Sequence, residues 1–293
     1  MNAKVISLKA AGTVVFSPCV VAVGNFDGVH QGHKAILASA REAADGLRIP
    51  LTVWTFSRLA KATETGAIMS PADRLAAIAE CGADCIISAD FGEYRDMTAA
   101  DFVSDELIGR LGCRAVVCGA NFRFGKGAEG DCTALEKLLS EHGVPLTVVP
   151  LAEMDGEVVS STRIRSLLAK GDVTAASLLM GNYFTVEGCV IHGKALGRTL
   201  GVPTANMMIP DWQTAVADGV YKTKAIVAGR GYDALTNVKG RLAETHLIGF
   251  QGDLYGKTLR VVFLRRIRGE RRFGSIDELA EAMRADIAAI TNE

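Results

Sequence analysis

Two histidines, His30 and His33, stand three residues apart at the end of a glycine-containing turn that follows the apolar run 20–23. The residues after the turn have helical spacing, so a helix is expected to begin there. Backbone N–H groups at a helix N-terminus lack intrahelical partners, and the helix dipole adds partial positive charge. Imidazoles also donate hydrogen bonds to phosphate oxygens. The pattern therefore favours a phosphate or nucleotide site.

Two other interpretations fit the same two histidines. An ordinary turn with surface histidines has this pattern, and zinc is a second candidate ligand. A zinc site needs more than two nearby ligands, and the helical His-Glu-x-x-His pattern is absent. Phosphate binding is therefore the preferred hypothesis, and the ordinary turn stays open.

Two later segments offer further groups that bind phosphate. Residues 119–127 follow an expected strand and combine glycines, the amide of Asn121, two aromatic rings and two cations. Residues 160–165 begin a helix and offer hydroxyl and guanidinium groups. Each alone is equally typical of a surface loop or a capped helix. Because ligands of a parallel sheet bind beyond the C-terminal strand ends, we expect both segments to meet the two histidines there.

Composition limits the classes of function. The chain has 293 residues, about half of them apolar, and a formal net charge of −1. This charge gives no support for binding a nucleic acid, and no run approaches the ~18 apolar residues of a membrane span. Seven cysteines without a Cys-x-x-Cys pair are typical of reduced thiols. We expect a cytoplasmic protein with no nucleic-acid or membrane partner, and a homo-oligomer remains open.

The first half of the chain alternates short apolar runs with helical stretches. Near-continuous apolar strands joined by helices predict a Rossmann-like parallel sheet covered on both faces. Helices are expected over 72–80, over 99–111 and over the segment that carries Lys34, Ile36, Leu37 and Ala40. Glycines just past a helix are typical of left-handed caps. The expected strands are 20–23, 51–56, 85–87, 115–118 and 146–149, and the capping glycines are Gly46, Gly82, Gly112 and Gly143.

The pattern changes after Pro150. Two helices, each ended by a glycine, are expected over 162–170 and 173–180, and alternating strands separated by glycine turns follow. They predict a small antiparallel β-barrel, with a last amphipathic helix on its outside that begins with capping-box spacing. The fold class is therefore α/β plus β. The expected barrel strands are 184–191, 220–227, 246–250 and 259–265, the last helix is 276–290, and the domains are 1–181 and 182–293.

A second group of candidate residues lies in the barrel. Thr204 and Asn206 offer oxygen atoms on one side of a strand, which suits Mg²⁺ bound together with phosphate and water. Glu244, expected just before a strand, can accept a proton from a hydroxyl group. The alternatives are a glycine-rich barrel loop for residues 193–206 and a surface salt bridge for Glu244. The loop is no Walker A motif, because Ser or Thr does not follow Lys194.

The motifs together resemble bacterial bifunctional riboflavin kinase/FAD synthetases over almost the whole chain. The segments similar to the adenylyltransferase half are 24–33, 119–125 and 160–165, and those similar to the riboflavin kinase half are 193–206, 218–221, 252–256 and 271–273. The resemblance implies that the barrel phosphorylates riboflavin with ATP to give FMN. It implies further that the N-terminal domain transfers an adenylyl group from ATP to FMN, releasing pyrophosphate and forming FAD.

The same resemblance implies roles for individual residues. Adenylyl transfer would be catalysed through positioning and charge stabilisation by His30, His33 and Arg165, with Mg²⁺ on the phosphates. In the kinase, Thr204 and Asn206 would hold Mg–ATP, and Glu244 would activate the ribityl 5′-hydroxyl. The other nucleotide-binding residues implied are Gly24, Phe26, Gly28, Asn121, Ser161, Thr162, Gly193, Lys194 and Gly201.

Three features depart from the family pattern. The usual Thr-Phe-x-Pro-His-Pro has become Thr-Phe-Ser-Arg-Leu-Ala in residues 55–60, where Arg58 is a substitute candidate for a phosphate contact. The kinase loop after Asn237 is shortened, and Gly249 stands where aspartate is frequent. Two alternatives follow: an enzyme that keeps only one activity, and a sensor that binds flavin or nucleotide without catalysis.

Overall fold

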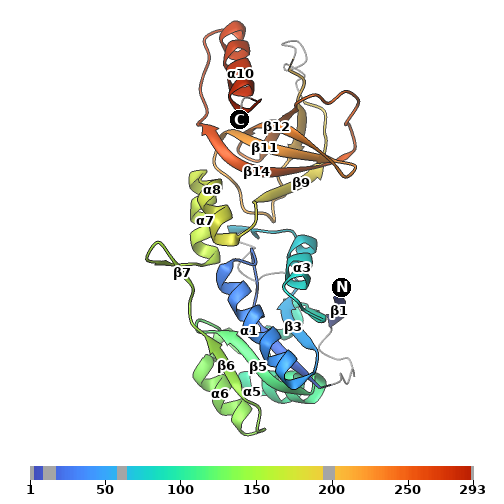
Figure 1. The fold of residues 1–293 in the computed structure, drawn as a ribbon, viewed down its shortest axis with the longest axis vertical. Coiled ribbons are helices and arrows are strands. Elements are labelled where there is room, and N and C mark those ends of the chain that lie inside the picture. Colours follow the sequence, from blue (N-terminus) through green and yellow to red (C-terminus); the bar gives the residue numbers. More distant parts are fainter. Residues whose placement is uncertain (1–2, 9–17, 58–64, 194–201, 292–293) are drawn as a thin grey trace. The chain divides into compact units, whose positions relative to one another are not determined.

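The computed structural model describes residues 3–8, 18–57, 65–193 and 202–291 of the chain (Figure 1). The chain divides into two compact units, Met1–Thr63 with Met69–Ser161, and Glu64–Ile68 with Thr162–Glu293. Each unit has its own sheet. The assignment of 1–181 and 182–293 to two functional domains remains a prediction.

The first unit is built on a six-stranded parallel sheet, which confirms the predicted α/β class. The strand order is β1-β4-β3-β2-β5-β6. All five expected strands are present, and an unpredicted edge strand, β1, pairs with β4. The strands are β1 (Lys4–Leu8), β2 (Cys19–Val23), β3 (Leu51–Phe56), β4 (Cys85–Ala89), β5 (Cys113–Gly119) and β6 (Leu146–Val149).

Helices cover both faces of this sheet because its strands are apolar on both sides. In β2, Val20 and Ala22 join the core under α1 (Gln31–Leu47) and α3 (Pro71–Glu80). The alternate residue Val21 joins the opposite core with α6 (Cys132–Ser140) and the helix over residues 102–110. This two-sided burial explains why the strands have near-continuous apolar sequences.

Two details of the predicted helices differ in the structure. Gly82, Gly112 and Gly143 have positive φ as expected, but Gly46 lies inside α1, and Arg48 takes the left-handed position after it. The segment expected as one α-helix over 99–111 forms α5 (Ala99–Asp101) followed by a π-helix, η1 (Phe102–Arg110).

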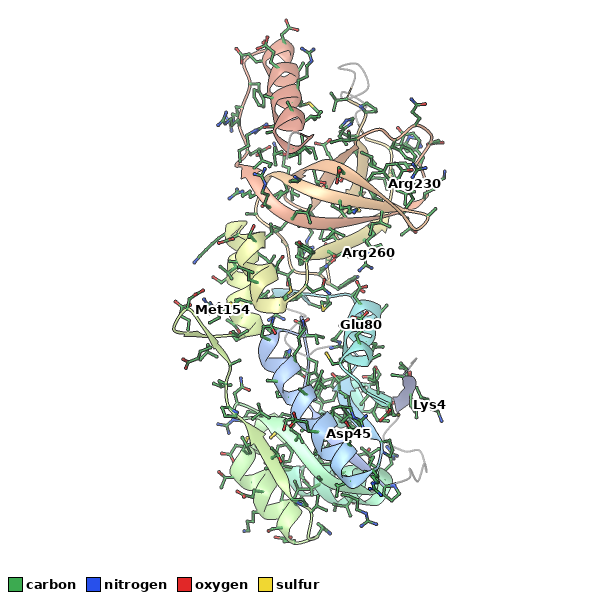
Figure 2. All side chains as sticks on the ribbon, viewed as in Figure 1. Lys4, Asp45, Glu80, Met154, Arg230 and Arg260 are labelled. Atoms are coloured by element: carbon green, nitrogen blue, oxygen red, sulfur yellow. The ribbon has the colours of Figure 1, made fainter. Side chains whose placement is uncertain are left out.

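A small hairpin precedes the end of the first unit. Strands β7 (Glu153–Met154) and β8 (Glu157–Val158) pair around Asp155 and Gly156, whose φ angles are +56° and +76° (Figure 2). Positive φ at both positions is what a two-residue hairpin turn requires, and Asp-Gly supplies it. The remaining short elements are α4 (Phe91–Tyr94) and η2 (Lys126–Ala128).

The second unit contains the predicted antiparallel barrel. Its strand order is β10-β13-β12-β11-β14-β9, and a bridge between Ile191 and Asn206, with an N···O distance of 2.8 Å, nearly closes it. Strand β10 contains Asn206, as the expected strand at Thr204 and Asn206 required, whereas β12 was not predicted. The strand expected over 246–250 is instead β13, which ends at Leu247. The strands are β9 (Thr185–Cys189), β10 (Ala205–Met208), β11 (Gly219–Val227), β12 (Arg230–Lys239), β13 (Leu242–Leu247) and β14 (Thr258–Arg268).

The helices of the second unit agree with the sequence. Helices α7 (Ser161–Lys170) and α8 (Val173–Met180) are followed by Gly171 and Gly181, both with positive φ. The last helix, α10 (Ile276–Thr291), packs on the outside of the barrel, where Ile290 contacts the cluster of Val220 and Leu235. An Arg268–Asp286 ion pair at 2.8 Å fixes it there, because both partners are largely buried.

Candidate functional site

The turn between β2 and α1 holds its backbone in an uncommon conformation. Phe26, Gly28 and Val29 have φ angles of +51°, +81° and +35°. Positive φ is costly for a β-branched residue such as Val29, and such strain concentrates at functional sites. Phe26 is fully buried beside Gly24, where an added Cβ would lie 3.0 Å from its ring. The buried ring thus anchors the turn that presents the two histidines.

The two histidines form a stacked pair at the start of α1. Their ring centroids lie 3.6 Å apart with an interplanar angle of 18°. His30 is the N-cap residue, and its Nδ1 accepts a hydrogen bond from the backbone N–H of His33 at 3.4 Å. In a neutral imidazole whose Nδ1 is an acceptor, Nε2 carries the hydrogen. His30 therefore has an Nε2–H donor that can bind an anion.

Both imidazoles are held neutral. Burial lowers the pKa of His30 to about 4, and burial together with His30 and Arg74 lowers the pKa of His33 well below its usual value. The Nδ1 atom of His33 is buried and has no hydrogen-bond partner among the described residues. A buried polar atom without a partner is rare and indicates that a ligand or water completes the site.

The neutral histidines give the first unit an acid-sensitive stability. The pKa of His30 is lower in the folded chain than in the unfolded chain, where it is about 6.5. The unfolded chain therefore binds the proton more readily, and the free energy of unfolding falls as the pH drops from 6.5 to 4. In the His30→Asn variant, the decrease in the free energy of unfolding between pH 6.5 and 4 is expected to be smaller by about 3 kcal/mol. Urea unfolding followed by Trp54 fluorescence in a Trp212→Phe background measures it in the first unit.

His142→Asn is the matched control, since His142 is exposed in the same unit. The pH dependence of the free energy of unfolding should be the same in this variant as in the parent protein. An equal fall in stability between pH 6.5 and 4 in the His30→Asn variant would contradict the assignment of a neutral, buried His30.

A buried arginine that the sequence did not indicate supports the histidine turn. Arg74, on α3, is 2% exposed, and its guanidinium donates to the backbone carbonyls of Asn25 at 3.1 Å and Ser57 at 3.3 Å. Burial lowers its pKa, and the charge of the buried Asp27 partly opposes this effect. Its Nε atom has no partner among the described residues. A buried cation on α3 thus contacts the turn that carries the neutral imidazoles, which favours an anionic ligand.

Two of the other predicted residues lie at the same edge of the sheet. Ser161, the last residue of the first unit, donates from its Oγ to the backbone carbonyl of Asp27 at 2.9 Å, next to the histidine turn. Asn121 is exposed just after β5, and β5 pairs in parallel with β2, so the C-terminal ends of both strands meet there. The structure thus brings His30, His33 and Ser161 together and places Asn121 at their edge.

Thr162 and Arg165 belong to the second compact unit. Arg165 Nε donates to the carbonyl of Gly66 at 2.9 Å, and that carbonyl also accepts a hydrogen bond from Thr214 Oγ1 at 3.0 Å. Residues 65–68 are held along Trp212–Thr214 by further backbone hydrogen bonds. Arg165 therefore has a positioning contact in this unit, and the nucleotide-binding roles of both residues remain predictions.

The candidate kinase residues share one face of the barrel. Asn206 on β10 lies directly opposite Glu244 on β13, and Glu244 lies opposite Asn237 on β12. The expectation that Glu244 precedes a strand is wrong, because it lies in the middle of β13. Asn237 Nδ2 is 3.5 Å from Glu244 Oε2. A carboxylate between two amides is thus held at a defined place on the sheet.

Gly193 and Asn206 are in close contact at the same end of the barrel. A Cβ added to Gly193 would lie 2.5 Å from Asn206 Nδ2, so a larger residue at this position would displace the Asn206 side chain. Thr204 is two residues before Asn206 and is half-buried. Lys194, Gly201 and Arg58 lie outside the described residues.

The described residues contain no cluster of side chains typical of a metal site. In the described ranges, no group of three or more His, Cys, Asp and Glu side chains could hold a metal ion. Thr204 and Asn206 suit a hard cation that takes most of its ligands from phosphate and water. No helix in the described part of the chain has the length and apolar character needed to span a membrane.

Comparison with known proteins connects both halves to flavin enzymes. The FAD synthetase family model matches residues 14–163, and the riboflavin kinase family model matches residues 180–293. Bifunctional riboflavin kinase/FMN adenylyltransferases from Escherichia coli K12 and Pseudomonas fluorescens are 34% and 36% identical, each over 92% of this chain and 91% of their own length. A relative with the same name from Bacillus subtilis is 31% identical over 91% of this chain and 90% of its own length.

One solved structure shares the fold over the whole chain. The crystal structure described as a macrolide-efflux protein from Streptococcus pneumoniae has a TM-score of 0.89 and 30% identity, and the match covers 99% of each chain. The two family models and the relatives identify a two-part transferase of phosphorus-containing groups. The chain belongs to the family of bifunctional riboflavin kinases/FMN adenylyltransferases.

Proposed function

We propose that the chain makes FAD from riboflavin in two ATP-dependent reactions at two separate sites. The barrel, within residues 182–293, phosphorylates riboflavin to FMN, and the parallel-sheet domain, within 1–181, adenylylates FMN. The observation that carries the proposal is the presence of both a neutral histidine pair at a strand end and a carboxylate between two amides, in a chain matched by both family models.

In adenylyl transfer, a phosphate oxygen of FMN attacks the α-phosphorus of ATP and pyrophosphate leaves. No protein nucleophile takes part, so the work of the chain is to position the reactants and stabilise charge. His30 Nε2–H donates to a phosphate oxygen, His33 lies stacked beside it, and the α1 N-terminus adds positive potential. Asn121, Ser161, Thr162 and Arg165 contact the nucleotide, as do Gly24, Phe26 and Gly28 through their backbone.

In the kinase reaction, the ribityl 5′-hydroxyl oxygen attacks the γ-phosphorus of ATP. Glu244 accepts the hydroxyl proton, and ADP leaves. Thr204 and Asn206 would hold Mg²⁺, which would neutralise phosphate charge. Gly193, Lys194 and Gly201 are the further residues proposed to bind the nucleotide. The full chain works in the cytoplasm, consistent with seven free cysteines, all in described positions.

One assay tests both activities. Purified protein is incubated with Mg-ATP and either riboflavin or FMN, and the flavins are separated by chromatography. FAD from riboflavin supports the proposal. FMN as the only product leaves the kinase alone, and FAD formed only from added FMN leaves the adenylyltransferase alone. Binding without turnover of either substrate would overturn the proposal in favour of a sensor.

A further inference from the structure

His246 makes a hydrogen bond that the proposed reactions do not yet use. Its Nδ1 atom lies 2.8 Å from the backbone carbonyl oxygen of Pro203. A carbonyl only accepts hydrogen bonds, so Nδ1 carries the hydrogen in this contact. Pro203 directly precedes Thr204, and His246 is two residues after Glu244 on the same face of β13.

The register of the barrel explains why a side chain is needed at this place. The pairing of β10 with β13 ends at Ala205 and Thr245, so Thr204 and Pro203 lie beyond the last pair. A ladder continued by one residue would bring Thr204 opposite His246. Instead, the imidazole of His246 donates a hydrogen bond to the Pro203 carbonyl. This side-chain hydrogen bond holds the segment beyond the last backbone-paired residues of β10 and β13.

Fixing this carbonyl fixes the residue that follows it. The Pro203 oxygen and the Thr204 N–H belong to one planar peptide unit, so their orientations are linked. Asn206 restrains the same turn from its other end, because its Nδ2 donates to the Thr204 carbonyl at 3.4 Å and its own carbonyl accepts from Ile191 N. The turn that carries both candidate Mg–ATP ligands is thus held at its two ends.

We propose that His246 is a positioning residue of the kinase reaction, which holds the turn from Pro203 to Asn206 in the conformation that binds Mg–ATP. The inference rests on the proposed kinase function. Its proposed role is that of an N–H donor to a backbone carbonyl, through which it acts on the residues that bind Mg–ATP.

Two substitutions separate the hydrogen bond from the packing of the side chain. Asparagine places an N–H donor the same number of bonds from Cα as Nδ1 of histidine, whereas leucine keeps apolar bulk and has no donor. His246→Leu is expected to raise the KM for Mg–ATP in riboflavin phosphorylation about five- to tenfold, the loss of one hydrogen bond. His246→Asn should stay within about twofold of the parent protein. His142→Leu, at an exposed histidine of the other unit, is the control.

The outcomes distinguish the inference from the function on which it rests. A KM for Mg–ATP that is unchanged in His246→Leu, or raised equally in His246→Asn, would overturn the positioning role. Parent protein that forms no FMN would overturn the kinase function instead. In that case, calorimetric titration with Mg–ATP still tests the role of His246. In the His246→Leu variant, the affinity for Mg–ATP should fall at the barrel site and stay unchanged at the other nucleotide site. Circular dichroism and thermal unfolding check the fold of every variant.

Discussion

Replacement of Glu244 by glutamine is expected to lower the rate of riboflavin phosphorylation about 10²- to 10⁴-fold, the range for loss of a general base. Glutamine keeps the size of the side chain, but its amide does not accept the proton of the ribityl 5′-hydroxyl. Glu244 lies opposite Asn206 on the barrel, so the base and a candidate Mg–ATP ligand are neighbours. Chromatography of the flavins formed from riboflavin measures the loss.

The same variant should convert added FMN to FAD at the parent rate, because the two reactions use separate sites. Glu281→Gln, at an exposed position of α10, is the matched control and should leave both reactions intact. FMN formation at the parent rate in a folded Glu244→Gln protein would show that Glu244 is not the base of the kinase site. Loss of both reactions would instead contradict the assignment of two separate sites.

The parallel sheet could be predicted from sequence because each of its strands is buried on both faces. Residues of β2 are all buried, and an uninterrupted apolar run followed by a glycine turn leaves few alternatives. The edge strand β1 was missed because Val5 is exposed and the run contains Lys4 and Ser7. A strand covered on one side only has a weaker apolar pattern.

The barrel was predicted less exactly because its interior contains hydroxyl groups. Thr223, Thr236 and Thr245 are fully buried and hydrogen-bond to one another at 2.8 and 3.0 Å across β11, β12 and β13. Threonines at inward positions make a strand look polar, so β12 was overlooked. The apolar residues 247–248 led to a predicted strand that continues to residue 250. Strand β13 ends at Leu247, two residues before Gly249, whose φ is +74°.

The residues of the candidate sites differ in whether a short sequence motif could indicate them. His30, His33, Thr204 and Asn206 could be chosen because each lies in a short motif. Arg74 and His246 could not, since they act on backbone carbonyls 49 and 43 residues away in sequence. Such contacts arise from the fold. The one local signal for Arg74 is a cation four residues before the buried Ile78, on the inner face of α3.

Replacement of His30 by alanine or asparagine is expected to lower the rate of FAD formation from FMN at least about 10²-fold, the effect of losing one donor that stabilises developing charge. Burial keeps the pKa of His30 at about 4, so its imidazole is neutral at pH 7 and Nε2 is the donor. Riboflavin phosphorylation should be unaffected. Both rates are measured on the same preparations by chromatography.

The two substitutions distinguish the imidazole from the helix cap. Alanine removes both the donor and the acceptor for His33 N–H, whereas asparagine is a good N-cap residue and keeps the acceptor. Equal losses of rate would identify Nε2 as the important atom. Recovery of the rate in His30→Asn would assign the effect to the cap. A rate of FAD formation that titrates near pH 6.5 in the parent protein, and not in His30→Asn, would contradict a neutral donor, because a group with a pKa of about 4 does not change its charge there.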